Sequence, residues 1–201
     1  MHRRHFLHTT PAWLAAVVPV TALGRAQTQA EPETAQRIEQ ALRAGGVVLA
    51  ARHALAPGNF DPPGFKLGDC STQRNLSDEG RAQARRLGDW VKAHGLSPAQ
   101  VRSSPWCRCE ETARLAFGTV QTWTALGSPR GFSDSQNQAH QRELRQALRT
   151  LADQQAPFEA WVTHNFVFSA LVGSSAASAE CLVLRPGAGD SIEVVARLAV
   201  A

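Results

Sequence analysis

The chain has 201 residues, of which 43% are hydrophobic and 19% are charged, and this composition is that of an ordinary globular protein with one domain. The formal net charge is +4, but the first 26 residues hold three arginines and no acidic residue. The remaining 18 basic and 17 acidic residues nearly cancel, so we expect no nucleic-acid partner.

The N-terminus has the pattern of an export signal. Arg3-Arg4-His5-Phe6-Leu7 resembles a twin-arginine signal, and the apolar run at 13–20 is too short to span a bilayer as a helix. We therefore expect a cleaved export signal at 1–30 and one folded domain at 31–201. The mature protein is expected in the periplasm, without a stable membrane span.

Helices and strands are expected to alternate along the rest of the chain. Helices are predicted at about 34–44, 77–94, 105–117, 138–151 and 166–172, and strands at 47–52, 100–104, 119–123 and 159–163, with a closing hairpin at 181–184 and 192–196. This order predicts a three-layer α/β/α sandwich with a mostly parallel central sheet. Residues 27–33 are expected to be flexible, and the loop at 54–76 has a length that is often functional.

Polar residues follow three of the predicted strands. Arg52 and His53 end the first strand, Ser103-Ser104 lead to Arg108 in the first turn of a helix, and His164 follows a later strand. In a parallel sheet these ends share one edge, where open α/β sheets bind their ligands. Two guanidinium groups, two imidazoles and a helix N-terminus suit an anion with several oxygens, above all phosphate. A histidine in such a site can attack phosphorus and form a phosphohistidine.

Four motifs occur in a characteristic order over about residues 46–173. They are Ala51-Arg52-His53-Ala54, then Asn75-Leu76-Ser77-Asp78-Glu79-Gly80-Arg81, then Ser103-Ser104-Pro105-Trp106-Cys107-Arg108, and finally Val162-Thr163-His164-Asn165. In this order they resemble the smaller branch of the histidine phosphatase superfamily, also called the phosphoglycerate mutase-like family. The resemblance implies the phosphoglycerate mutase-like fold, a catalytic His53, phosphate-binding Arg52 and Arg108, and His164 as the second histidine. It also implies a small phosphorylated substrate and no metal or other cofactor.

The chain departs from the family pattern in two ways. Ala54 stands where the family usually has glycine, and the segment 123–134 contains no carboxylate before Asp134, although the smaller branch usually has its general acid in this region. Asp134 is therefore our first candidate for the acid, followed by Asp61 and Asp69 from the long loop. A site without an acid still cleaves a substrate that has a good leaving group.

Four cysteines in an exported chain indicate one or two disulfides. Cys107 and Cys109 are too close within a helix to favour each other, so we expect Cys70 to pair with one of them and to hold the long loop over the pocket. Buried free thiols are the alternative.

These observations predict an exported phosphatase that hydrolyses a phosphomonoester through a phosphohistidine on His53. Arg74 and Asn75, from the end of the long loop, are expected to reach the phosphate oxygens or the rest of the substrate. Two alternatives stay open: a catalytically weak protein that binds a phosphorylated ligand, and a phosphatase specific for a cell-surface sugar phosphate.

Overall fold

The computed structural model describes the backbone of residues 21–200 and the side chains from residue 33 onward. The paired arginines and the apolar run of the predicted export signal lie outside these described residues. Within the described part of the chain, no helix is both long enough and apolar enough to cross a membrane.

A six-stranded mixed sheet forms the centre of the molecule, with the strand order β3-β2-β4-β1-β5-β6. The strands are β1 (Val48–Arg52), β2 (Gln100–Ser103), β3 (Gln121–Thr122), β4 (Glu159–Thr163), β5 (Cys181–Pro186) and β6 (Ile192–Leu198). The first four strands in the chain pair in parallel, whereas β5 runs antiparallel to β1 and β6 runs antiparallel to β5. The mostly parallel sheet and the closing hairpin predicted from the sequence are thus confirmed.

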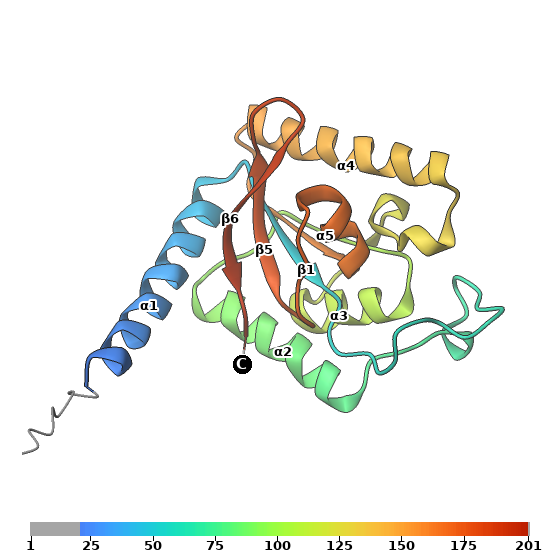
Figure 1. Ribbon diagram of the computed structural model, residues 1–201, viewed down its shortest axis with the longest axis horizontal. Coiled ribbons are helices and arrows are strands. Elements are labelled where there is room, and N and C mark those ends of the chain that lie inside the picture. The colour runs from blue at the N-terminus through green and yellow to red at the C-terminus, as the bar shows by residue number, and fades with distance from the viewer. Residues whose placement is uncertain (1–20, 201) are drawn as a thin grey trace, which may run out of the picture.

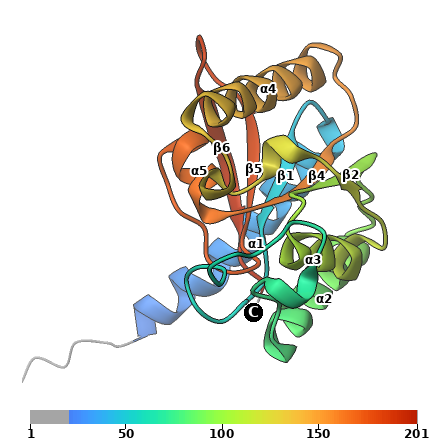
Figure 2. The ribbon, with the colours of Figure 1, turned by 90° about the vertical axis from the view of Figure 1, so that its right-hand side faces the viewer.

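Helices cover both faces of this sheet and complete the three layers (Figures 1 and 2). On one face lie α1 (Thr21–Ala44), α2 (Asp78–Ala93) and α3 (Cys107–Phe117), and on the other lie α4 (Asp134–Asp153) and α5 (Asn165–Val172). Successive side chains of a strand point to opposite faces, so β1 contributes to both cores. Leu49 and Ala51 pack under α1, α2 and α3, while Val48 and Ala50 pack under α4 and α5.

Two helix boundaries differ from the sequence prediction. The segment 27–33, expected to be flexible, is helical because α1 begins at Thr21, in a stretch whose alanines and glutamines favour helix. α4 begins at Asp134 instead of near residue 138, because Ser133 and Gln136 form a capping box. The Ser133 hydroxyl accepts from the Gln136 N–H, and the Gln136 side chain accepts from the Ser133 N–H.

The ends of three parallel strands meet at one edge of the sheet, as the sequence predicts. Arg52 at the end of β1 is in register with Thr163 at the end of β4, and the His53 N–H donates to the Thr163 carbonyl at 2.9 Å. On the other side of β4, the Ser104 N–H donates to the Val162 carbonyl at 2.9 Å. The residues that follow these strands are therefore held by the sheet itself.

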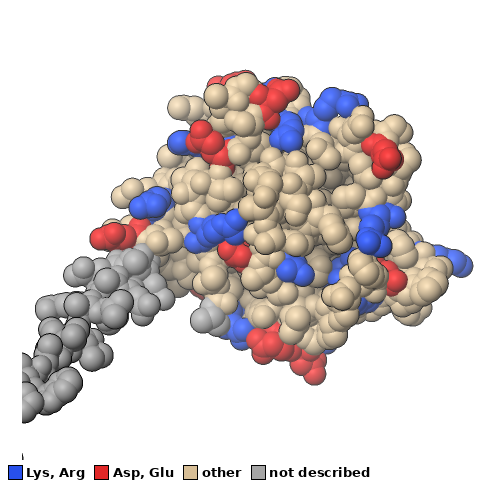
Figure 3. All heavy atoms as spheres, in the orientation of Figure 1, with Lys and Arg blue, Asp and Glu red and all other residues tan. Residues whose placement is uncertain are grey.

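Charged side chains of both signs are interspersed on the face of the molecule that Figure 3 shows, with no extended field of one sign. Many of the arginines pair with a nearby carboxylate, as Arg43 does with Glu39 and Arg86 with Glu79. Exposed pairs of this kind contribute little to stability, but they neutralise the surface locally. Several arginines also gather in a pocket, at the edge where the strand ends meet.

Candidate active site

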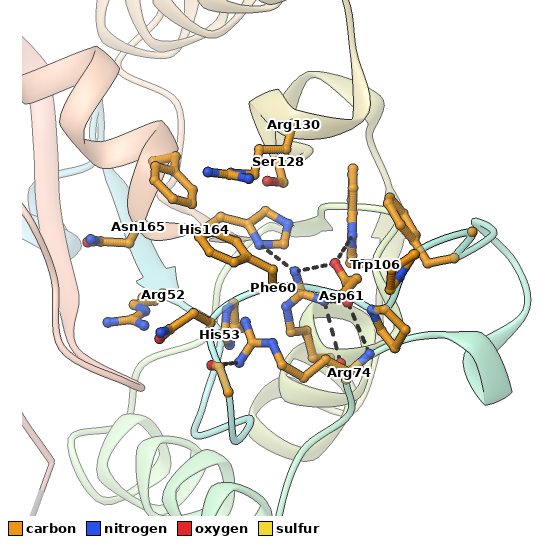
Figure 4. Close-up of a pocket in the computed structure, with 18 residues that line it drawn as sticks. Arg52, His53, Phe60, Asp61, Arg74, Trp106, Ser128, Arg130, His164 and Asn165 are labelled. Atoms are coloured by element: carbon orange, nitrogen blue, oxygen red, sulfur yellow. Dashed lines mark hydrogen bonds and ion pairs between the residues drawn. The ribbon is translucent and has the colours of Figure 1, made fainter.

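A pocket of about 500 Å³ opens at this edge of the sheet. The loop at 54–76 forms one wall, and the start of α3, the segment 128–130 and the start of α5 form the others. Six residues singled out from the sequence line it together: Arg52, His53, Asp61, Arg74, Arg108 and His164 (Figure 4). The convergence of distant motifs on one pocket is therefore confirmed.

His53 is buried and presents one ring nitrogen for chemistry. Its Nδ1 lies 2.8 Å from the carbonyl oxygen of Ala54. Because a carbonyl oxygen only accepts hydrogen bonds, Nδ1 carries the proton and Nε2 keeps a free lone pair. Ala54 is completely buried and its N–H donates to Oγ1 of Thr112 at 3.0 Å, so the residue that replaces glycine is accommodated at this turn.

His164 lies beside His53, with 5.4 Å between the ring centroids. Its Nε2 is 2.7 Å from the Ser104 hydroxyl, and its Nδ1 is 3.5 Å from Nη2 of Arg108. The indole ring of Trp106 packs edge-on against this imidazole, with 5.1 Å between centroids. Polar and aromatic contacts from the start of α3 thus fix the second histidine.

Both histidines are held in the neutral form. Burial, aided by the positive charges of Arg108 and Arg52, lowers the pKa of His53 to about 3, despite the hydrogen bond to Ala54. Burial is also the main reason that the pKa of His164 lies well below its usual value. Near neutral pH the unprotonated Nε2 of His53 is therefore available as a nucleophile.

Three arginines surround these histidines. Arg52 donates from Nη1 to the Ala176 carbonyl at 2.8 Å, and Arg74 donates to the carbonyls of Ala56 and Gly58. These carbonyls orient the two guanidinium groups without neutralising them. The Nε atoms of Arg52, Arg74 and Arg108 are all buried without an acceptor in the described part of the chain. The three cations are therefore arranged for an anion.

Asp61, one of the candidates for the general acid from the long loop, brings a carboxylate into this pocket. Its two oxygens lie 2.8 and 3.3 Å from the terminal nitrogens of Arg108. They also accept from the Trp106 indole N–H and the Arg74 backbone N–H, each at 3.0 Å. Burial alone raises the pKa of Asp61, but the Arg74 N–H and the charge of Arg108 outweigh it and leave the pKa below its ordinary value. Asp61 is therefore ionised at neutral pH.

The structure does not bring every candidate to the pocket. Asp134, the first candidate for the general acid, is an exposed residue at the start of α4 and does not line the pocket. Asp69 caps a short 3₁₀ helix by accepting from the Ser71 N–H. The Asn75 side chain donates to the Cys70 carbonyl at 2.7 Å, so it supports the loop and is absent from the pocket lining.

One disulfide ties the long loop to the start of α3. It joins Cys70 to Cys107, beside Arg108, whereas Cys109 and Cys181 are free and buried. The expected link from Cys70 to this helix is confirmed, with Cys107 as the partner. Burial raises the pKa of Cys109 to about 12, so this residue is a neutral thiol, 3.5 Å from Nε2 of His164.

Sequence reasoning missed the outer part of the pocket. Phe60, Arg130 and Phe166 come from three separate segments, and Arg130 packs against both rings. The disulfide was the available signal, because a loop tied down at Cys70 has to bring the residues before it, including Phe60 and Asp61, over the pocket.

Comparison with known proteins agrees with this geometry. Residues 49–127 match the family model of the histidine phosphatase superfamily (branch 1). No curated protein matches the chain.

Solved structures share the fold at low sequence identity. The protein histidine phosphatase SixA complexed with tungstate has 15% identity and a TM-score of 0.53, over 76% of this chain and 96% of that one. The product of the open reading frame Rv3214 of Mycobacterium tuberculosis has 19% identity and a TM-score of 0.53, over 74% and 94% of the two chains. A mycobacterial glucosyl-3-phosphoglycerate phosphatase has 16% identity and a TM-score of 0.52, over 74% and 96%. The family match spans residues 49–127, which include the first three motifs, and the solved structures share the fold of the chain, so the chain is similar to the histidine phosphatase superfamily over this region.

Proposed function

We propose that this protein is a phosphatase that hydrolyses phosphomonoesters through a phosphohistidine on His53. The observation that carries the proposal is the state of His53: its Nδ1 is engaged by the Ala54 carbonyl and its Nε2 is unprotonated, in a pocket lined by four arginines. A neutral imidazole beside buried cations is suited to attack a phosphate whose charge those cations offset.

The proposed reaction has two steps. Nε2 of His53 attacks phosphorus, and the bond from phosphorus to the ester oxygen breaks with its electron pair on the leaving oxygen. Water then attacks the phosphohistidine, and the bond from phosphorus to nitrogen breaks to release phosphate and free His53. Arg52 and Arg74 bind the phosphoryl oxygens through their guanidinium groups, which lie close to His53 (Figure 4).

The leaving oxygen needs a proton unless it is a stable anion. Asp61 is the only carboxylate that lines the pocket within the described chain, and it is ionised and paired with Arg108. In this state it accepts hydrogen bonds and does not donate a proton. We therefore expect substrates with acidic leaving groups to be hydrolysed faster than simple alkyl phosphates.

The test is hydrolysis of an aryl phosphate by the wild-type protein and by His53→Ala. His94→Ala is a matched control, because His94 stacks on Trp90 at the end of α2 and does not line the pocket. The expected result is turnover by the wild type and by His94→Ala, with a loss of at least a hundredfold in His53→Ala. A labelled phosphoryl group trapped on the wild type is expected to be acid-labile and base-stable. Turnover that survives His53→Ala overturns the nucleophile assignment.

The pairing of Asp61 with Arg108 also favours a second candidate, a protein that binds a phosphorylated ligand and turns it over weakly. Under this alternative, calorimetry shows saturable phosphate binding that depends on Arg52, while the aryl phosphate is not hydrolysed. The same pair of experiments therefore separates the two functions.

We further propose that the protein acts outside the cytoplasm. The disulfide between Cys70 and Cys107 supports this location, because such bonds persist in oxidising compartments. The twin-arginine pattern at Arg3-Arg4 gives the route. Replacing both arginines with lysine is expected to leave the full-length protein in the cytoplasmic fraction. Unchanged export of that variant contradicts the twin-arginine route.

A further inference from the structure

At the mouth of the pocket, one cation has no anionic partner. Arg130 is exposed, and its guanidinium makes no hydrogen bond or ion pair with any residue in the described part of the chain. It lies instead over the ring of Phe60, 3.9 Å from the centroid, and 5.7 Å from the centroid of Phe166. Because these ring contacts use none of the guanidinium N–H groups in a hydrogen bond to an oxygen or nitrogen, the N–H groups are available to a ligand.

The three residues come from separate parts of the chain. Phe60 belongs to the loop that the disulfide restrains, Arg130 follows β3, and Phe166 lies in the first turn of α5. Phe60 and Phe166 are 55% and 46% exposed, an unusual degree for phenyl rings that face a pocket. We call this group the Arg130 clamp.

The charges in the pocket leave Arg130 unmatched. The pocket lining holds four arginines and one carboxylate, and both histidines are neutral. Asp61 offsets Arg108, and a phosphate dianion offsets Arg52 and Arg74. Figure 4 shows Arg130 on the opposite side of the pocket from Arg52 and Arg74, with His164 between them and His53 beside Arg52 and Arg74. The phosphoryl group on His53 therefore leaves the charge of Arg130 unsatisfied.

We propose that the Arg130 clamp binds a second anionic group, a carboxylate or a phosphate, on the leaving-group part of the substrate. The inference rests on the proposed phosphatase function and adds the substrate class to it. The apolar walls at Phe60, Phe65 and Phe166 suit a ring or hydrocarbon segment between the two anionic groups. A substrate of this class spans the pocket, with its phosphoryl group at the strand ends and its second anion at Arg130.

The experiment measures binding, so that its outcome does not depend on turnover. Calorimetry compares two non-hydrolysable ligands, 4-carboxybenzyl phosphonate and its uncharged counterpart 4-carbamoylbenzyl phosphonate, with the 3-substituted pair as a second geometry. A 1,4-xylylene bisphosphonate replaces the carboxylate by a second phosphorus group and so distinguishes the two kinds of anion. The wild type is expected to prefer a doubly anionic ligand roughly five- to tenfold over the carbamoyl ligand, because the contact is charge-assisted but exposed.

Substitutions at Arg130 identify the residue responsible. Arg130→Gln is expected to abolish the preference, and Arg130→Lys to restore part of it, because lysine keeps the charge without the planar fork. Arg142→Gln is the control with the same change in charge, since Arg142 is exposed on α4 and lies outside the pocket. It is expected to keep the full preference.

Equal affinities of the wild type for charged and uncharged ligands overturn the proposal, and so does a preference that survives Arg130→Gln. Failure of the proposed phosphatase function gives a different result from failure of the Arg130 clamp. In that case the phosphonates bind with the expected preference, but aryl phosphates are not hydrolysed.

Discussion

The carboxylate of Asp61 occupies both terminal nitrogens of Arg108, with Oδ1 at 2.8 Å from Nη1 and Oδ2 at 3.3 Å from Nη2. This is the fork-to-fork geometry in which a guanidinium binds a phosphate. An incoming phosphoryl group therefore competes with an anion that the protein itself supplies. Among the described residues, the guanidinium groups of Arg52 and Arg74 donate to carbonyl oxygens and make no hydrogen bond to Asp61, so they face no such competition.

Asp61→Asn is expected to strengthen binding of inorganic phosphate about tenfold, which corresponds to ~1.4 kcal/mol, because the amide does not compete as an anion for Arg108. Calorimetry with phosphate measures the change. Asp69→Asn, in the same loop but outside the pocket, is the control and is expected to leave the affinity unchanged. Weaker phosphate binding in Asp61→Asn contradicts the idea of competition and shows that the carboxylate mainly positions Arg108.

The unfolding free energy is expected to fall as the pH drops below about 6.5. The pKa of His53 is about 3 in the folded protein, while in the unfolded chain it has its ordinary value of 6.5. Between these values the unfolded state binds more protons, so stability rises with pH and is lost on acidification, by up to ~1.4 kcal/mol per pH unit for each such histidine.

Urea unfolding at pH 7, 6 and 5 tests this dependence above the range in which carboxylates titrate. His53→Gln is expected to have a shallower slope than the wild type, and His94→Gln to keep the wild-type slope. Identical slopes for all three proteins contradict a depressed pKa at His53.

Removal of the disulfide is expected to weaken both stability and catalysis. The bridge joins residues 37 positions apart, and closing such a loop stabilises a fold by ~2–4 kcal/mol. The loop carries Arg74, so we expect Cys70→Ser/Cys107→Ser to have a lower unfolding free energy and a higher KM for an aryl phosphate. Dithiothreitol should reproduce both effects in the wild type and in Cys181→Ala, whose thiol is free. A KM that does not change when the disulfide is reduced shows that the other contacts of the loop hold it in place.

Thr112 links the two halves of the phosphate site. Its hydroxyl accepts from the Ala54 N–H, next to His53, and donates to the Arg108 carbonyl at 2.7 Å. Thr112→Val keeps the shape but leaves a buried N–H without an acceptor, which costs about 1–3 kcal/mol of unfolding free energy. Thr150→Val is the control, because Thr150 makes the same type of bond to the carbonyl four residues before it, on the exposed face of α4. Equal stability losses in the two variants contradict a special role for Thr112.

The inner part of the site could be predicted because it follows from strand ends. Apolar runs that stop at Arg52-His53 and at His164 fix both the strands and the residues that follow them, and parallel pairing brings them together. The position of Asp61 could not be derived in this way. It lies in a loop without periodicity, and its place depends on contacts with Arg108 and Trp106 that form only in the folded chain.

The same limit explains why the sequence suggested Asp134 as the acid and did not point to Arg130 as a pocket residue. The absence of a carboxylate earlier in segment 123–134 made Asp134 the nearest candidate for the acid, but the Ser133 cap directs it into the exposed start of α4. Arg130 lies four residues before Asp134. Its side chain lies at the pocket, where it packs against two phenyl rings from distant segments of the chain. The two residues are close together in the sequence, so their positions along the chain do not tell which one lines the pocket. The turn between them decides it in the folded chain.

The position of the bridge divides the long loop into two parts. Residues 54–69 are held between the end of β1 and Cys70 and supply Phe60 and Asp61, while Arg74 lies beyond the bridge. A Cβ atom added at Gly64 or Gly68 would have no neighbouring atom within 4 Å, and Leu67 is exposed. The pocket wall is therefore built in two grades: its outer stretch around Gly64 to Gly68 is loosely packed, whereas the strand ends that bear His53 and His164 are fixed by the hydrogen bonds of the sheet.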